Sequence, residues 1–139
     1  MNGDYAKILR RLEAMPVWHK IADPAIGWLA SKTTGWTADS FSGGLEVDFS
    51  AVVPVGTKAV RVAVYCINAS SVYSRASGDS NISNTPGASL EYSAWIAYNS
   101  AGHLTGRRVI WLSADYKADF AVSDTGADLY ISYPSEWLG

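Results

Sequence analysis

The sequence predicts a mostly β protein, an antiparallel β-sandwich or jelly-roll-like domain that begins with a short helix. Three observations support this fold class: a three- and four-residue apolar spacing near the start, alternating apolar and polar residues from residue 45 onward, and short strand-like runs separated by turn residues. The 139 residues match the usual size of one domain. We expect a helix over 1–16, a connector over 17–44 and a β-sandwich domain over 45–139.

The predicted helix carries an apolar stripe with the a/d rhythm of helices that pair with copies of themselves. Pro16 ends it, because proline lacks a backbone N–H and disfavours helical geometry in the residue before it. Isolated helices shorter than about 12–15 residues are marginal in water, so other contacts would also have to hold the copies together. The alternative is one amphipathic helix that lies on its own domain. The residues predicted to associate with their copies, as a coiled-coil stub, are Tyr5, Ile8, Leu12 and Met15.

The strands are predicted from two-residue alternation and from β-branched and aromatic residues. Within the connector we expect ordered coil with one short turn or strand around 26–30. Residues 68–89 are rich in Ser, Asn and Gly and are predicted to form an exposed loop. The last four strands are expected to pair as two successive hairpins. The predicted strands cover 45–49, 58–67 (a central strand), 90–98, 104–112, 119–123 and 129–133.

Charge and composition exclude several classes of partner. The net charge is −2 and neither sign forms a run, so we expect no nucleic acid partner. No apolar run is long enough to span a bilayer, so we expect no membrane insertion. Cys66 is the single cysteine and is expected to behave as a small buried hydrophobe. The abundant aromatic residues suit protein or sugar contact, although most, such as Trp36, Trp95 and Trp111, are expected in the core or in subunit contacts.

One short motif raises the question of catalysis. The string Asp124-Thr125-Gly126-Ala127-Asp128 resembles the active-site loop of aspartic proteases, in its retroviral form, in which one Asp from each copy shares a proton and activates water. That family also places an apolar pair and a glycine well downstream, where this chain has only residues 127–139. We therefore interpret the string as a hairpin turn.

Other catalytic and metal-binding patterns are missing from the sequence. His19 and His103 are the only imidazole bases, and no Gly-x-Ser-x-Gly elbow occurs. The carboxylates are scattered, and no Cys/His cluster has zinc-ligand spacing. We predict that the protein is not an enzyme and that it uses no cofactor and no metal.

The residues predicted to contact a ligand lie in the loop over 68–89. An apolar ring and a planar cation with several donors stand out there among small residues, and a loop of this kind has little core to offer. The alternative is a mobile loop without a binding role. The candidate ligand-binding residues are Tyr73, Arg75, Asn81 and Asn84.

Two segments carry a resemblance to a known family. The run from Val47 to Val62, VDFSAVVPVGTKAVRV, is followed by a Tyr/Ser-rich loop and then by DTGADLYI at 124–131. This pattern, spread over roughly residues 35–139, resembles the C-terminal tip domains of bacteriophage tail fibres. The resemblance implies a homotrimer on the virion, extracellular when attached to the host, whose β tip binds a host cell-surface glycan or protein, either a polysaccharide or an outer-membrane protein.

Three other functions remain open at this point. The chain is alternatively a structural virion protein, such as a fibre connector or a capsid decoration. Its tryptophans also suit a carbohydrate-binding module. The enzymatic alternative is a depolymerase whose two carboxylates come from two chains.

Overall fold

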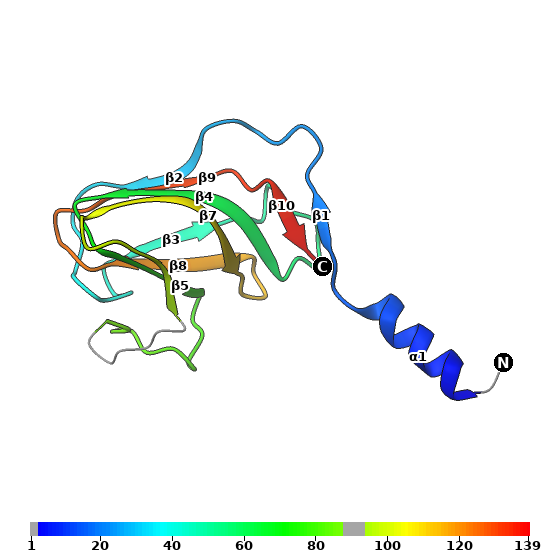
Figure 1. Ribbon diagram of the computed structural model, residues 1–139. Helices are drawn as coiled ribbons and strands as arrows, with labels where there is room; N and C mark the ends of the chain where they lie inside the picture. The colour runs from blue at the N-terminus through cyan, green and yellow to red at the C-terminus, as the bar shows by residue number, and fades with distance from the viewer. Residues whose placement is uncertain (1–2, 88–93) are drawn as a thin grey trace.

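The computed structural model describes residues 3–87 and 94–139, and over these residues the chain forms one helix and ten strands (Figure 1). All the strand pairs in this part of the chain are antiparallel, so a mostly β, antiparallel fold with a short N-terminal helix is confirmed. The elements are α1 (Gly3–Ala14), β1 (Trp18–Lys20), β2 (Trp28–Lys32), β3 (Leu45–Asp48), β4 (Ala59–Ile67), β5 (Ser71–Ala76), β6 (Trp95–Tyr98), β7 (His103–Trp111), β8 (Lys117–Val122), β9 (Asp128–Ser132) and β10 (Glu136–Leu138).

The strands form two sheets that lie one above the other in Figure 1. In the described residues the larger sheet has six strands, ordered β1-β10-β4-β9-β2 with β7 on the other side of β4. The smaller sheet has four, ordered β3-β8-β5-β6. β4 pairs along its whole length with β7 and on its other side with β10 and then β9, so its prediction as a central strand is confirmed.

The strand pairs are nested around the centre of the chain: β5 pairs with β6, β4 with β7, β3 with β8, β2 with β9 and β1 with β10. The two predicted hairpins are therefore wrong. β6 and β7 belong to different sheets, and so do β8 and β9. Two consecutive strands can lie in opposite layers and turn their apolar faces toward one another. A turn signal between two strands therefore does not specify which strand each of them pairs with.

Residues 17–44, expected to be a connector with one short strand, contribute two strands. β1 pairs with β10 and β2 pairs with β9, so both lie at the margins of the larger sheet. Trp36, farther along, is buried as predicted, and its Nε1 donates a hydrogen bond of 2.9 Å to the carbonyl oxygen of Ala127. This stretch is thereby fastened to the beginning of β9.

The predicted loop over 68–89 is wrong in its first part, because β5 occupies Ser71–Ala76 between β6 and β8. This strand is buried on both faces. Val72 joins the main core, whereas Tyr73 packs with Phe41 and Ala121 in a second, smaller cluster. Buried serines complete the strand, so the alternation that marks a half-buried strand is missing from its sequence.

The main core lies between the two sheets. The inward side chains of β4 meet those of β5, β8 and β9, and the largest fully buried side chains include Phe49, Phe120, Ile110, Leu129 and Ile131. Cys66 is also fully buried there, as predicted. Burial, reinforced by the charge of Asp128, raises the pKa of its thiol to about 11, so the thiol stays protonated at neutral pH.

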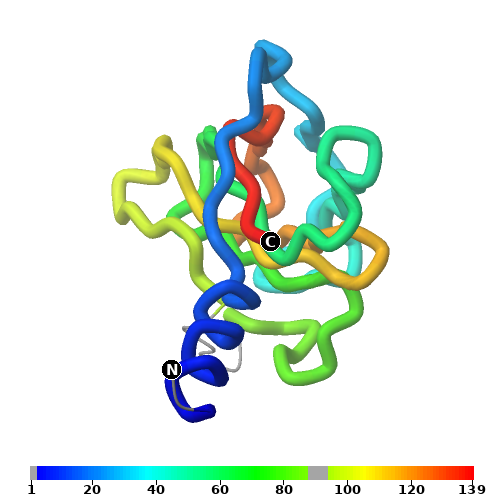
Figure 2. Tube along the Cα trace, turned by 90° about the vertical axis from the view of Figure 1, so that its right-hand side faces the viewer, coloured from blue at the N-terminus to red at the C-terminus, as the bar shows by residue number. Residues whose placement is uncertain are grey.

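The helix α1 stands away from the sheets (Figure 1), and none of its residues is buried. It ends at Ala14, close to the stop predicted at Pro16. The alternative in which this helix lies on its own domain is therefore wrong. Figure 2 shows the first strand running beside the last, which is the β1–β10 pair. The helix thus leaves the body next to the C-terminal strand.

Candidate functional site

The four predicted ligand-binding residues have very different surroundings. Tyr73 is only 3% exposed, and its hydroxyl donates a hydrogen bond of 2.8 Å to Asp39 Oδ1. Arg75 lies on the same strand, whereas Asn81 and Asn84 are exposed in the segment that follows it. The structure brings Arg75 and Asn84 together but places Tyr73 in the smaller apolar cluster. That these residues bind a ligand stays a prediction.

Arg75 holds the segment 77–87 onto the smaller sheet. Its Nε donates to Asp119 Oδ2 at 3.0 Å, its Nη1 to the carbonyl oxygen of Ile82 at 2.8 Å, and its Nη2 to Asn84 Oδ1 at 2.7 Å. The guanidinium also lies 4.5 Å from the centre of the Phe41 ring. A planar cation with five donors can satisfy several acceptors in this way. Arg75 is therefore largely engaged by the protein itself.

Tyr73 has an ionisation that depends on folding. Burial, together with the hydrogen bond to Asp39 and its negative charge, raises the pKa of the phenol from its ordinary value of 10.0 to about 12. The unfolded chain therefore releases this proton at a lower pH than the folded chain does. The contribution of the neutral phenol to stability is fully present below pH 10 and is lost as the pH rises toward 12.

We expect the free energy of unfolding to fall between pH 10 and pH 12 in the wild type, and to fall less steeply in Tyr73→Phe, which has no phenol to ionise. The measurement is urea unfolding at a series of pH values. Tyr98→Phe, which removes an exposed phenol, is the control and should keep the wild-type slope. Equal slopes for the wild type and Tyr73→Phe would contradict the prediction.

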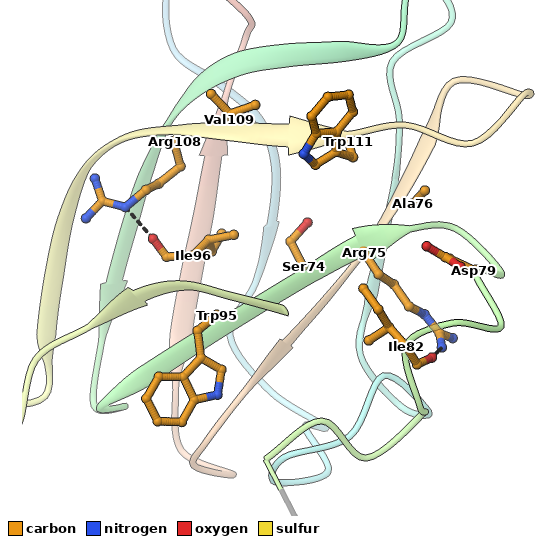
Figure 3. Close-up of a pocket in the computed structure, with 10 residues that line it drawn as sticks. All are labelled: Ser74, Arg75, Ala76, Asp79, Ile82, Trp95, Ile96, Arg108, Val109 and Trp111. Carbon is orange, nitrogen blue, oxygen red and sulfur yellow. Dashed lines mark hydrogen bonds between the residues drawn. The ribbon is translucent and has the colours of Figure 1, made fainter. Parts of the chain in front are cut away.

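A cleft of about 340 Å³ opens beside Arg75, where β7 of the larger sheet passes over β5 and β6 of the smaller one (Figure 3). Its apolar wall comes from Ile96, Val109 and Trp111. The side chain of Ser74, on β5, lies in the space between β5 and β7. Arg108 lies at one end, where its Nε donates to the carbonyl oxygen of Ile96. Asp79, Ile82 and Arg75 lie at the other end.

Two side chains in this cleft are unusual for their positions. Trp111 is 57% exposed, although tryptophan generally buries most of its surface. Ser74 has the opposite character: it is 7% exposed, and its hydroxyl has no hydrogen-bond partner among the residues that the structure describes. Figure 3 shows that this hydroxyl points into the space between β5 and β7. The lining of the cleft therefore includes both an exposed aromatic ring and a desolvated hydroxyl.

The residues considered for catalysis have structural roles. Asp124 Oδ1 accepts the backbone N–H of Gly126 at 2.8 Å in an exposed turn that joins the two sheets. The imidazole of His19 stacks on Trp137 at 4.1 Å, and that of His103 packs edge-on against Tyr65. In the parts of the chain that are described, no three His, Cys, Asp or Glu side chains gather as metal ligands would.

The described portion of the chain also has no helix with the length and apolar character that a membrane span requires. Comparison with protein-family models, with curated proteins and with solved structures found no match. The geometry defines a structural class: an antiparallel two-layer β protein with a separate N-terminal helix and a cleft between its layers.

Sequence reasoning did not find the cleft. Its lining comes from three successive strands, β5, β6 and β7, that do not all belong to one sheet, and one of them, β5, was expected to be a loop. Trp111 was expected in the core or in a subunit contact, and nothing in the local sequence singles out Ser74. The one available signal was Trp111 at the end of an alternating strand, because an aromatic ring at an edge can face solvent.

Proposed function

We propose that this chain is the receptor-binding tip of a bacteriophage tail fibre, that three copies associate through α1 and the β domain, and that the trimer attaches the virion to a host cell-surface glycan or protein. The two-layer fold would then be a jelly-roll-like sandwich, a class to which its nested antiparallel pairs are suited. The tip binds without catalysis in this proposal.

The observation that carries the proposal is the exposed apolar stripe of α1. Tyr5, Ile8 and Leu12 lie on α1 and Met15 follows its last residue; the four side chains are each 51–58% exposed and repeat at a/d spacing. A two-heptad helix needs a partner to be stable, and copies of the same helix provide a matching stripe. Burial of this apolar surface between copies would stabilise them.

Trimerisation would also suit attachment. Three copies of a weak site gain avidity for a repetitive surface by raising the effective concentration of the second and third contacts. None of the residues that line the cleft belongs to α1. β4 begins in the first of the two segments that resemble tail-fibre tips and β9 begins in the second; the two strands pair in the larger sheet just beyond the end of the first segment, from Val64 to Ile67.

The test is the molar mass in solution, measured by light scattering over a range of concentrations, together with adsorption of the labelled protein to a panel of bacterial strains. We expect the mass of three chains and saturable adsorption to at least one strain, displaced by unlabelled protein. A single-chain mass at every concentration would overturn the trimer and favour a monomeric carbohydrate-binding module. A trimer that adsorbs to no strain but binds other virion proteins would favour a structural virion protein.

A further inference from the structure

The cleft between β5, β6 and β7 has the size and form of a site for a small ring. Its volume of about 340 Å³ is near the lower end of the roughly 300–1,000 Å³ that is typical of small-molecule sites. Such sites combine an apolar lining with a few placed polar groups. Here Ile96, Val109 and Trp111 provide the apolar lining, and Ser74 and Asp79 provide polar atoms.

The indole of Trp111 offers the cleft a flat apolar surface. It is more than half exposed at the end of β7, so its position is not explained by packing in the core. A flat ring with an N–H at its edge stacks well on a ligand that has an apolar face and a polar rim. Pyranose rings have this form, because their C–H groups gather on a face while their hydroxyls lie around the edge.

The hydroxyl of Ser74 requires a partner that the described protein does not provide. A buried hydroxyl without a hydrogen bond costs about 1–3 kcal/mol of stability. The hydroxyl points into the cleft, so a ligand hydroxyl placed there could both donate to it and accept from it. At the other end, Asp79 Oδ1 accepts the backbone N–H of Asn81, and the carboxylate retains further acceptor sites.

The charges around the cleft balance. Arg75 is paired with Asp119, and the remaining lining charges, Arg108 and Asp79, have opposite signs. Arg108 is also engaged by the carbonyl oxygens of Ile96 and Arg107. A site that selects an anionic sugar would present a net positive charge. This cleft instead suits an uncharged ligand with many hydroxyls.

We infer that the cleft binds a neutral pyranose, with the sugar ring stacked on Trp111 and one sugar hydroxyl bonded to Ser74 Oγ. The inference deepens the proposed function and rests on it only in that the protein is taken to bind its target without catalysis. In the free protein the described residues leave the hydroxyl of Ser74 without a hydrogen bond, and the bound sugar would provide one.

The test is ligand-observed NMR titration with D-glucose, D-galactose, D-mannose and N-acetyl-D-glucosamine, with D-glucuronic acid as the anionic comparison. We expect at least one neutral sugar to bind, Trp111→Ala to weaken that binding at least about tenfold, and Ser74→Ala to weaken it about twofold to tenfold. Trp28→Ala is the matched control, since Trp28 is also about half exposed, at 48%, and lies outside the cleft. It should leave the affinity unchanged.

Urea unfolding of the same variants separates binding from folding. Ser74→Ala should be at least as stable as the wild type, because it removes the unsatisfied hydroxyl, so its weaker binding cannot come from unfolding. Failure of all four neutral sugars to bind, an unchanged affinity in Trp111→Ala, or tighter binding of D-glucuronic acid would each overturn the inference.

Molar mass and cell adsorption, measured on the same samples, keep the two proposals apart. A trimer that adsorbs to cells equally well as wild type and as Trp111→Ala would overturn the sugar site alone. Sugar binding that depends on Trp111 in a monomer that adsorbs to no cell would overturn the attachment function and support the site.

Discussion

Phe120→Ala is expected to lower the free energy of unfolding by about 3–5 kcal/mol, because it removes most of a fully buried aromatic side chain and leaves a cavity between the sheets. Phe120 lies on β8, which is paired with β3 on one side and β5 on the other, so the backbone around it has little freedom to collapse into the space. Domains of this kind have a total stability of about 5–15 kcal/mol. The variant would lose a large part of it.

Equilibrium urea unfolding followed by circular dichroism measures this loss. Val55→Ala is the control: it also shortens an apolar side chain, but Val55 is exposed in the turn between β3 and β4, and its change should stay within about 0.5 kcal/mol. A loss below about 1 kcal/mol in Phe120→Ala would contradict the packing of the two sheets around this ring.

Ile8→Asp/Leu12→Asp is expected to convert the proposed trimer into single chains. The substitutions would place two carboxylates from each copy in the apolar seam, where burial of unpaired charge costs several kcal/mol per ion. If attachment depends on three linked sites, adsorption to the cell surface should weaken by about 10²–10⁴-fold. Light scattering and a cell-adsorption assay measure the two effects.

The matched control, Lys7→Asp/Arg10→Asp, introduces the same residue type twice on the same helix but outside the stripe. It should leave the molar mass unchanged. In both variants the circular dichroism of the β domain should be retained, since α1 contributes no buried residue to it. A trimer that survives Ile8→Asp/Leu12→Asp would show that the helix stripe is not the association surface.

The strands that were predictable are those with one apolar and one polar face. β3, β4, β7, β8 and β9 lie within two residues of the predicted bounds, because alternation records burial on one side only. β5 was missed because both of its faces are covered and its buried positions include serines. The partners of each strand were not predictable either, since nested pairing brings together residues as far apart as Trp18 and Leu138.

The candidate site was harder to predict than the fold. Tyr73 and Arg75 stood out by residue type, and both prove to be tied to other parts of the chain by hydrogen bonds. Ser74, between them, looks ordinary in the sequence. Its significance comes from its burial and from a hydroxyl to which no described residue is hydrogen-bonded, and both depend on how β7 crosses β5. Sequence spacing carries no information about that crossing.

The pairing of β1 with β10 also determines how the protein would respond to a pulling force. The ends of this pair are reinforced by reciprocal hydrogen bonds between Val17 and Gly139, of 3.3 and 3.1 Å, and by Ile21 N–H donating to the carbonyl oxygen of Ser135 at 3.0 Å. Tension that enters through α1 runs along the axis of β1, beside its antiparallel neighbour β10, so these bonds are loaded in shear and share the force. The short first strand would thus act as a mechanical clamp between an anchored helix and the sheets.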